Sequence, residues 1–452
     1  MKSTIKKIGA LALALVIVLA MGTTAFAADM TGENGVIGEF TTADTATVQN
    51  DTVVIYKEIT AYNPETCTVN APTITFNYTI GAGAAGMTIT DAYSHHNKIN
   101  DANVNATVKT KAGVGTPTIT GTAAGVLAIT PADQLAASVN GTANRFGITI
   151  DFTNVSFTSA PGTGAGVYRY VISETTDETA KNAAGIKEGT VANTLYMDVY
   201  VNGSGKIYGY VLFTDNGNID ASPDNDAGAA SAAGKTEGFV GGVADGTAYS
   251  SDTSAADKYY TFNLDLKKVV ENDAYAVSTK HQFPFTVTLD NPTVTAAVLP
   301  IMTVGDNATQ TALTAAAIGT GTTPTEWKPT IANDATISYV GIPCGTTVTV
   351  YETNDVTGVT YTSVSANADT DAKAKPIGTN EESNTATVNC GATALNAATE
   401  NHTVSANKAV TFTNTLLQIS PTGVVMRVGP YLLIVALGAV LFLFTRRRKV
   451  VE

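Results

Sequence analysis

The sequence predicts an all-β protein made of two tandem β-sandwich domains, placed between an N-terminal signal peptide and one C-terminal transmembrane helix. Short segments rich in Val, Ile, Thr, Tyr and Phe alternate between apolar and polar residues, which is typical of half-buried strands. Gly, Asn, Asp and Pro separate these segments, and no amphipathic helical pattern interrupts them between the two termini. Hydrophobic residues make up 44% of the 452-residue chain, enough to form packed cores.

The first 27 residues have the three parts of a secretory signal peptide. Lysines stand near the start, an apolar stretch follows, and Ala25-Phe26-Ala27 fits the small-x-small cleavage rule. We therefore expect residues 1–27 to be removed on export, so that the mature chain starts near Ala28. The alternative is an N-terminal membrane anchor that is retained.

The strand-like segments fall into two groups, each of which would form one sandwich. The first domain, residues 28–263, contains the segments at 52–59, 73–80, 167–174, 195–201 and 206–213. The second domain, residues 264–418, contains the segments at 283–289, 347–352 and 409–415. Residues 215–258 are rich in Gly, Ala and Asp, and we interpret them as a long surface loop of the first domain.

No cofactor, metal or nucleic acid is expected as a partner. The formal net charge is -13, and no basic face is available to meet phosphates. The segment "GAGAAG" (81–86) matches a phosphate-binding glycine pattern, but no helix follows it. The three cysteines lack the spacing of a metal knuckle, and their odd number leaves at least one outside any intrachain disulfide. A Cys344–Cys390 bond stays open at this point.

The C-terminal tail, residues 424–452, predicts a membrane-spanning segment with a cytoplasmic end. The chain is uncharged and mostly apolar from Val428 to Thr445, about 18 residues, which is just long enough to span a bilayer. Three arginines and a lysine follow at 446–449 and would stay in the cytoplasm. By itself this pattern indicates a plain membrane anchor.

Three polar residues of the second domain lie on strand faces that otherwise carry apolar residues. These residues are Lys268, Glu352 and Asn414, and each alternates with Leu, Val or Phe neighbours. Side chains on one face of a strand point the same way, so all three should point into the core. An unpaired charge is costly there, and either a buried salt bridge or strand ends that reach solvent would account for them.

The residues just before the tail, Ile419-Ser420-Pro421-Thr422-Gly423, resemble the LPXTG-type sorting signal of Gram-positive surface proteins. The order of motif, apolar span and basic tail carries the resemblance, and the Pro-Thr-Gly part is closest to the V-P-T-G variant of some pilins. The resemblance implies that a sortase cysteine attacks the carbonyl of Thr422 and releases Gly423 onward. The acyl group would then pass to an amine of the cell wall or of another subunit.

The second domain resembles the CnaB- and FctA-type isopeptide domains of Gram-positive pilins and adhesins, which are Ig-like β-sandwiches. The phrases "GIPCGTTVTVYET" and "VTFTNT" look like that family's motifs around its Glu and its Asn. The resemblance implies that Lys268 attacks Asn414, that Glu352 is the catalytic proton donor, and that ammonia leaves. A core position disfavours charge, which would supply the neutral amine and neutral acid that this reaction needs.

The first domain carries a similar set. Lys57 lies on an apolar strand face, and Glu174 ends the phrase "GVYRYVISE", which resembles the family's strand before its Glu. The resemblance implies a second isopeptide bond, catalysed by Glu174, between Lys57 and Asn263, which occupies the corresponding place in chain order. Asn193 also lies on an apolar face, but in a different strand.

Together these patterns predict a cell-wall-anchored structural surface protein, a pilin-like subunit and not an enzyme. Its partners would be a sortase, and either peptidoglycan or other pilin subunits. Lys258, beside the acidic loop, is the expected acceptor lysine if subunits polymerise. The alternative is a wall-anchored adhesin that binds a host or matrix ligand through residues 80–165 or 215–258 without polymerising. A secreted enzyme is a third class, but no catalytic set is legible.

Overall fold

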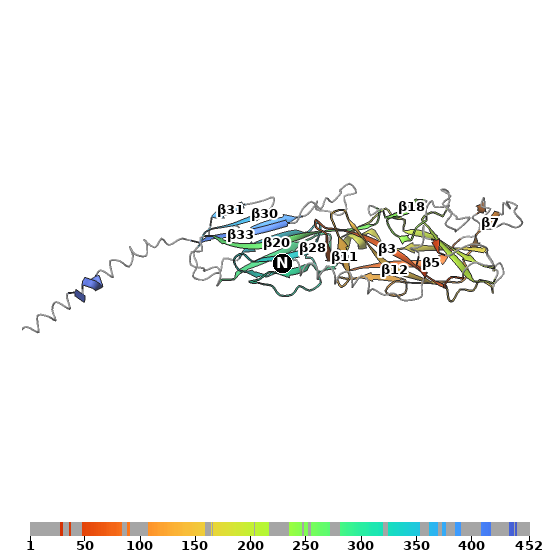
Figure 1. Ribbon diagram of the computed structural model, residues 1–452, viewed down its shortest axis with the longest axis horizontal. Coiled ribbons are helices and arrows are strands. Elements are labelled where there is room, and N and C mark those ends of the chain that lie inside the picture. The colour runs from red at the N-terminus through yellow and green to blue at the C-terminus, as the bar shows by residue number, and fades with distance from the viewer. Residues whose placement is uncertain are drawn as a thin grey trace, which may run out of the picture.

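The protein is all-β, as the sequence predicts, and Figure 1 shows its computed structural model as two β-rich bodies in line along the long axis. The structure describes residues 28–29, 36–37, 48–83, 88–90, 107–158, 164, 166–202, 204–216, 235–245, 248–251, 255–271, 281–319, 324–352, 361–368, 373–376, 385–389, 408–416, 434–437 and 439–440. Within these ranges no helix is long and apolar enough to cross a membrane. The predicted signal peptide and sorting motif, and most of the predicted transmembrane segment, lie outside them.

The first body consists of two sheets packed face to face. One sheet contains β3 (Thr52–Tyr62), β9 (Thr118–Thr120), β12 (Thr142–Asp151), β1 (Ala28–Asp29), β14 (Ile186–Lys187), β17 (Gly238–Phe239) and the first half of β20 (Asp257–Glu271). The other contains β10 (Val126–Ile129), β5 (Ile74–Ala82), β13 (Gly166–Glu174), β15 (Thr194–Val201), β16 (Ile207–Phe213), β2 (Val36–Ile37) and β8 (Lys111–Ala112). Ile55, Phe76, Ile148, Tyr170 and Met197 belong to the core between them.

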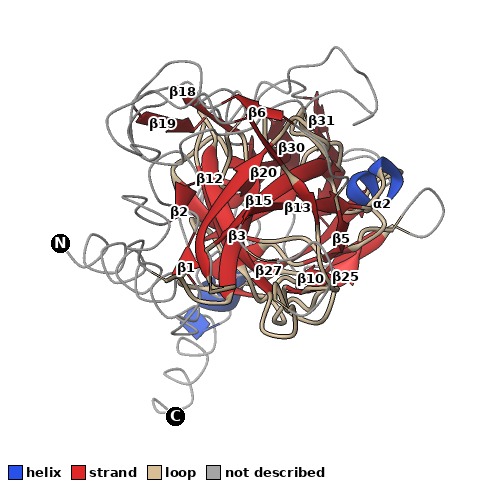
Figure 2. Ribbon diagram, turned by 90° about the vertical axis from the view of Figure 1, so that its right-hand side faces the viewer, coloured by secondary structure: helices blue, strands red, loops and turns tan. Residues whose placement is uncertain are grey.

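Smaller elements complete this body. They are the strand pairs β4 (Cys67–Asn70) with β11 (Gln134–Ala137), β6 (Thr88–Thr90) with β7 (Thr107–Lys109), and β18 (Gly242–Asp245) with β19 (Ala248–Ser251), and the helix α2 (Glu178–Ala183). The Asp177 side chain caps α2 by accepting from the Ala180 N–H. Figure 2, along the rod, shows α2 at the edge of the strands. Part of the predicted loop 215–258 is instead structured, since residues 235–241 are buried and contribute β17.

The second body is also a pair of packed sheets. One contains β23 (Ile301–Val304), β28 (Thr336–Pro343), the second half of β20, β33 (Lys408–Leu416), β30 (Tyr361–Ala368) and β31 (Lys373–Pro376). The other contains β24 (Ala308–Thr309), β27 (Thr330–Ile331), β21 (Phe283–Asp290), β29 (Thr347–Glu352), β32 (Thr385–Asn389) and β26 (Thr325–Trp327), and β22 (Ala297–Val298) pairs with β25 (Ala316–Ala317) nearby. Leu266, Phe285, Ile337, Val350 and Phe412 belong to the core.

The strand β20 belongs to both bodies. Its residues 257–260 pair in parallel with residues 59–62 of β3, and its residues 264–271 pair in parallel with residues 408–415 of β33. The predicted domain boundary at 263/264 therefore falls inside one continuous strand of 15 residues. At about 3.3 Å per residue this strand is roughly 50 Å long, and it fixes the line along which the two bodies follow each other.

Candidate functional site

Lys268, Glu352 and Asn414 come together in the core of the second body. Lys268 lies on β20 and Asn414 on the neighbouring parallel strand β33, where the register pairs Lys268 with Phe412 and Val270 with Asn414. Glu352 ends β29 in the opposite sheet, paired with Phe285 of β21. Alternation along each strand turns all three side chains inward.

Glu352 bridges the other two side chains. Its Oε2 lies 2.9 Å from the Lys268 Nζ, and its Oε1 accepts a hydrogen bond of 2.6 Å from the Asn414 Nδ2. Lys268 and Asn414 are fully buried and Glu352 is 4% exposed. The Asn414 Oδ1 is buried and accepts no hydrogen bond from the described part of the chain. Within that part, no group is hydrogen-bonded to the carbonyl oxygen of this amide.

The surroundings of Lys268 favour its uncharged form. Burial lowers the pKa of Lys268 to about 8, although the charge of Glu352 and its hydrogen bond act in the opposite direction. The Nζ also lies 4.5 Å from the centre of the Phe283 ring, so one side of the amine faces an apolar surface. A neutral amine beside a carboxamide and a carboxyl group is the arrangement that nucleophilic attack on the amide carbon requires.

The first body has a different set of residues at the corresponding place. The Lys57 Nζ lies 2.9 Å from Glu174 Oε2 and 2.8 Å from Asp257 Oδ2. A second ammonium, that of Lys181 on α2, lies 2.8 Å from Glu174 Oε1 and 3.2 Å from the same Oδ2 of Asp257. Two lysines and two carboxylates thus alternate in a closed ring, and all four residues are buried.

Three more groups face this ring. Glu188 Oε1 lies 2.9 Å from the Lys181 Nζ and has a partly exposed side chain. The Tyr78 hydroxyl donates to Glu174 Oε2 over 3.3 Å, and the Gly189 N–H donates to Asp257 Oδ1 over 2.8 Å. The pKa of Tyr78 lies well above its usual value, through burial and then the charge of Glu174, so Tyr78 stays a neutral donor.

The ring stabilises its charged forms. Burial acts to raise the pKa of Asp257, but the ammonium groups of Lys57 and Lys181 outweigh it and the pKa is lowered. Burial likewise acts to lower the pKa of Lys181, but Asp257 and Glu174 outweigh it and the pKa is raised above its usual value. In the second body one carboxyl group faces one amine, so this mutual support is missing there.

Asn263 lies away from Lys57, so the structure does not bring the expected first-domain pair together. Asn263 exchanges two side-chain hydrogen bonds, of 2.8 and 2.9 Å, with Asn63, and its Oδ1 also accepts from the Gly341 N–H over 3.2 Å. Asn263 is six residues beyond Asp257 on β20, roughly 20 Å along an extended strand. Its side chain joins the two bodies at their junction.

Asp257 and Lys181 were not identified from the sequence. Asp257 is the first residue of β20, inside the segment interpreted as a loop. Lys181 lies on a helix of six residues, too short to give a helical pattern. The Asp177 cap three residues before Ala180 was the one legible signal for this helix.

Lys258, the expected acceptor, lies within paired strands. It is opposite Lys187 of β14 and beside Thr60 of β3, and it is half-buried near the junction of the two bodies. Lys206, by contrast, is exposed in the tight turn between β15 and β16. The Asn202 Oδ1 accepts from the N–H groups of Ser204 and Lys206, each over 3.0 Å, and fixes this turn.

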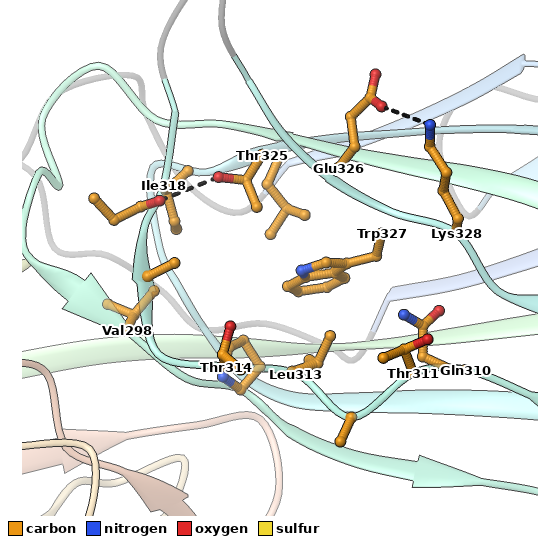
Figure 3. A pocket seen from close by; sticks show the side chains of 15 residues that line it. Val298, Gln310, Thr311, Leu313, Thr314, Ile318, Thr325, Glu326, Trp327 and Lys328 are labelled. Atoms are coloured by element: carbon orange, nitrogen blue, oxygen red, sulfur yellow. Dashed lines mark hydrogen bonds and ion pairs between the residues drawn. The ribbon is translucent and has the colours of Figure 1, made fainter.

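The second body also contains a pocket of about 310 Å³ (Figure 3). Trp327 forms one wall, and Val298, Leu313 and Ile318 contribute apolar surface. Exposed Glu326 and Lys328 form an ion pair of 3.3 Å beside it. Across the part of the chain that the structure describes, no group of His, Cys, Asp and Glu is placed to hold a metal ion.

No family model matches the chain, and no curated protein matches it in sequence. Among solved structures, two major pilin proteins from different serotypes of Streptococcus pyogenes are similar at 16% and 17% identity, with TM-scores of 0.32 and 0.34. Each match covers 81% of this chain and 99% of the pilin. A pilus-presented adhesin matches at 14% identity over 50% of this chain and 37% of its own, with a TM-score of 0.23. Similarity at these TM-scores is too weak to support an assignment of function.

Proposed function

We propose that the protein is a wall-anchored, pilin-like structural subunit whose second body is closed by an isopeptide bond between Lys268 and Asn414. The observation that carries this proposal is the bridge formed by Glu352, which lies within hydrogen-bond distance of both reacting side chains in the buried core. Lysine, glutamate and asparagine side chains are rarely fully buried, because burying a charged or polar group is costly. The burial of all three at one place therefore calls for an explanation, and the reaction provides one.

Each residue has one role in the reaction. The neutral Lys268 Nζ attacks the Asn414 Cγ, while Glu352, which contacts both the Nζ and the Nδ2, takes up a proton from the attacking amine and donates it to the departing Nδ2. The Cγ–Nδ2 bond breaks, and the nitrogen leaves as ammonia with a proton relayed by Glu352. A new Nζ–Cγ amide bond remains, and Lys268 can no longer carry a charge in the core, which removes the cost of desolvating an ammonium group there.

The intact mass of the mature chain without its membrane tail tests this chemistry. The wild type should be lighter than its sequence by one ammonia, and tandem mass spectrometry should find the peptides of Lys268 and Asn414 joined. Lys268→Met should have its full sequence mass. A well-folded wild type with its full sequence mass would refute the cross-link.

Display on the wall is the second part of the proposal. The proposed sorting motif begins three residues after β33 ends, and β33 ends at the side of the second body that lies away from the first. Thr422→Ala should abolish covalent attachment to peptidoglycan, whereas Ser420→Ala should have a smaller effect. Thr422→Ala protein that still remains linked to the wall would contradict the sorting-signal assignment.

Polymerisation requires an accessible lysine. Lys206 is exposed and Lys258 is half-buried, which favours Lys206 as the acceptor. The β15–β16 turn lies beside the chain just before β3, since Ile207 accepts from the Gln49 N–H. β3 runs from there toward the junction, and β20 continues to the other end. The seven residues of β3 before Ile59 and the length of β20 together put Lys206 about 70 Å from the end of the second body at which β33 ends. Head-to-tail joining needs such opposite ends.

The alternative function is an adhesin that binds a host or matrix ligand and does not polymerise. The pocket beside Trp327 is the observation that favours it, because a single aromatic wall with polar rims suits small ligands. Cells that show only monomers in wall extracts, and that lose adhesion with Trp327→Ala, would support this alternative over the pilin proposal.

A further inference from the structure

The two bodies differ in the charges around their central lysine. In the second body Lys268 contacts one carboxyl group and a neutral amide. In the first body Lys57 contacts two carboxylates, and Lys181 contacts the same two, at four N···O distances between 2.8 and 3.2 Å. Each charge in this ring touches two charges of the opposite sign.

We propose that the first body is closed by an ionic clasp, in which Lys181 holds Lys57, Glu174 and Asp257 in their charged forms and so prevents a covalent bond between Lys57 and Asp257. This inference goes beyond the proposed function, which concerns the second body. It rests on the proposed function only for the chemistry that would occur when the clasp is broken.

The reaction that is prevented would be a condensation. The Lys57 Nζ would form an amide bond to the Asp257 Cγ, and one Cγ–Oδ bond would break. The oxygen would leave as water with two protons that the ammonium group gives up, so that no other reactant is needed. Before attack, however, a proton must move from Lys57 to the carboxyl group, because only a neutral amine attacks and only a protonated acid loses water readily.

Lys181 opposes that proton transfer. It lies 3.2 Å from the very Oδ2 that faces Lys57, and 2.8 Å from Glu174, which would relay the proton. While its charge is present, each carboxylate contacts two ammonium groups. Opposite charges so close favour the ionised form of a carboxyl group and so oppose its protonation. Glu188 Oε1 also lies 2.9 Å from the Lys181 Nζ, so it helps to keep Lys181 charged and leaves this effect in place.

Without the charge of Lys181, the carboxyl groups of the site would face a single amine, as the carboxyl group of the second body does. Two buried carboxylates would share one ammonium group, and repulsion would leave one of them protonated. Asp257 or Glu174 would then hold a proton beside Lys57, and Lys57 would give up its own to the other. Removing Lys181 should therefore create a covalent cross-link. If the ion pairs of Lys181 were only structural, removing it would lower the stability of the first body and create no new bond.

The experiment measures intact mass and linked peptides in the mature chain carrying Glu352→Gln, so that the second body contributes no mass loss. In this background the otherwise wild-type first body should have its full mass and no joined peptides. Lys181→Met should lose one water, with the peptides of Lys57 and Asp257 joined. Lys181→Arg, which keeps the charge, should stay unlinked, and adding Asp257→Ala to Lys181→Met should abolish the water loss. Lys181→Gln replaces Lys181→Met if the latter does not fold.

Three results would overturn the clasp. A Lys57–Asp257 link in the chain that retains Lys181 shows that Lys181 does not prevent the reaction. A folded Lys181→Met or Lys181→Gln protein with full mass shows that its charge is not what prevents it. Equal linking in Lys181→Arg and Lys181→Met shows an effect of packing and not of charge. None of these results depends on whether ammonia is lost from the second body with Glu352 intact, which tests the proposed function separately.

Discussion

Replacing Glu352 by Gln should leave the second body folded but uncrosslinked. Gln has nearly the same volume and can accept the hydrogen bond of Asn414 Nδ2 that Glu352 now accepts over 2.6 Å. It cannot carry the proton that the reaction needs, so Lys268 and Asn414 should remain separate. The substitution thus removes the chemistry with little change in the packing of the core.

The loss of stability can be estimated from the chain that the bond encloses. Lys268 and Asn414 are about 146 residues apart, and closing a loop of that size stabilises the folded state by about 5 kcal/mol in the chain-entropy treatment of cross-links. For a domain of about 150 residues, each kcal/mol corresponds to roughly 2–4 °C in melting temperature. The Glu352→Gln protein should therefore melt roughly 10–20 °C lower in its second transition.

Calorimetry of the mature chain, with intact mass measured on the same sample, checks this estimate. Lys268→Met provides the matched control, because it also prevents the bond while leaving no buried ammonium group. Both variants should have their full sequence mass, without the loss of one ammonia expected for the wild type. Their melting temperatures should fall by similar amounts. The reasoning fails if Glu352→Gln keeps the wild-type melting temperature while its mass shows no cross-link, since loop closure would then contribute nothing measurable.

Three further predictions concern the buried charges and the positions of the lysines. In Asn414→Ala the amine of Lys268 stays free, and its pKa of about 8 lies below the unfolded value of about 10.4, so the unfolded chain binds more protons. The unfolding free energy should therefore rise by about 1.5 kcal/mol from pH 8 to 9.5. An unfolding free energy, measured by denaturant titration, that stays constant over this pH range would contradict the prediction. The pKa of Asp257 is lowered in the folded protein, so the first body should lose stability as the pH falls below about 4. In Asp257→Asn the melting temperature of the first body should depend less on pH in this acid range. In wall extracts analysed by electrophoresis, Lys206→Ala should abolish polymer ladders and Lys258→Ala should not; the reverse result would reinstate Lys258 as the acceptor.

The period-two alternation was enough to predict the all-β class and the inward direction of Lys268, Glu352 and Asn414, because strand geometry fixes which residues share a face. Their meeting depends on register and on the packing of two sheets, which a single sequence does not specify. Asn263 shows the limit: it is buried, but the register places it against Asn63 at the junction.

Asp257 and Lys181 show a second limit. Asp257 contacts both Lys57 and Lys181, and these contacts join a strand start, a helix of six residues and a distant strand, which are separated by more than 70 residues along the chain. Local pattern carries no information on such contacts, and the Gly- and Ala-rich stretch before Asp257 suggested a loop. Buried ion pairs of this kind become visible only when the strands are placed in space.

The continuity of β20 has a mechanical consequence. β20 enters the second body from the first, β33 leaves it toward the tail, and the two run parallel side by side from Leu264 to Glu271. A pull along the rod would load their hydrogen bonds in shear, so that they resist together instead of opening one by one. With the proposed bond from Lys268 to Asn414 in place, force would pass from strand to strand through that bond. The intervening stretch of about 145 residues, a contour length of roughly 500 Å, would carry no load and could not be drawn out.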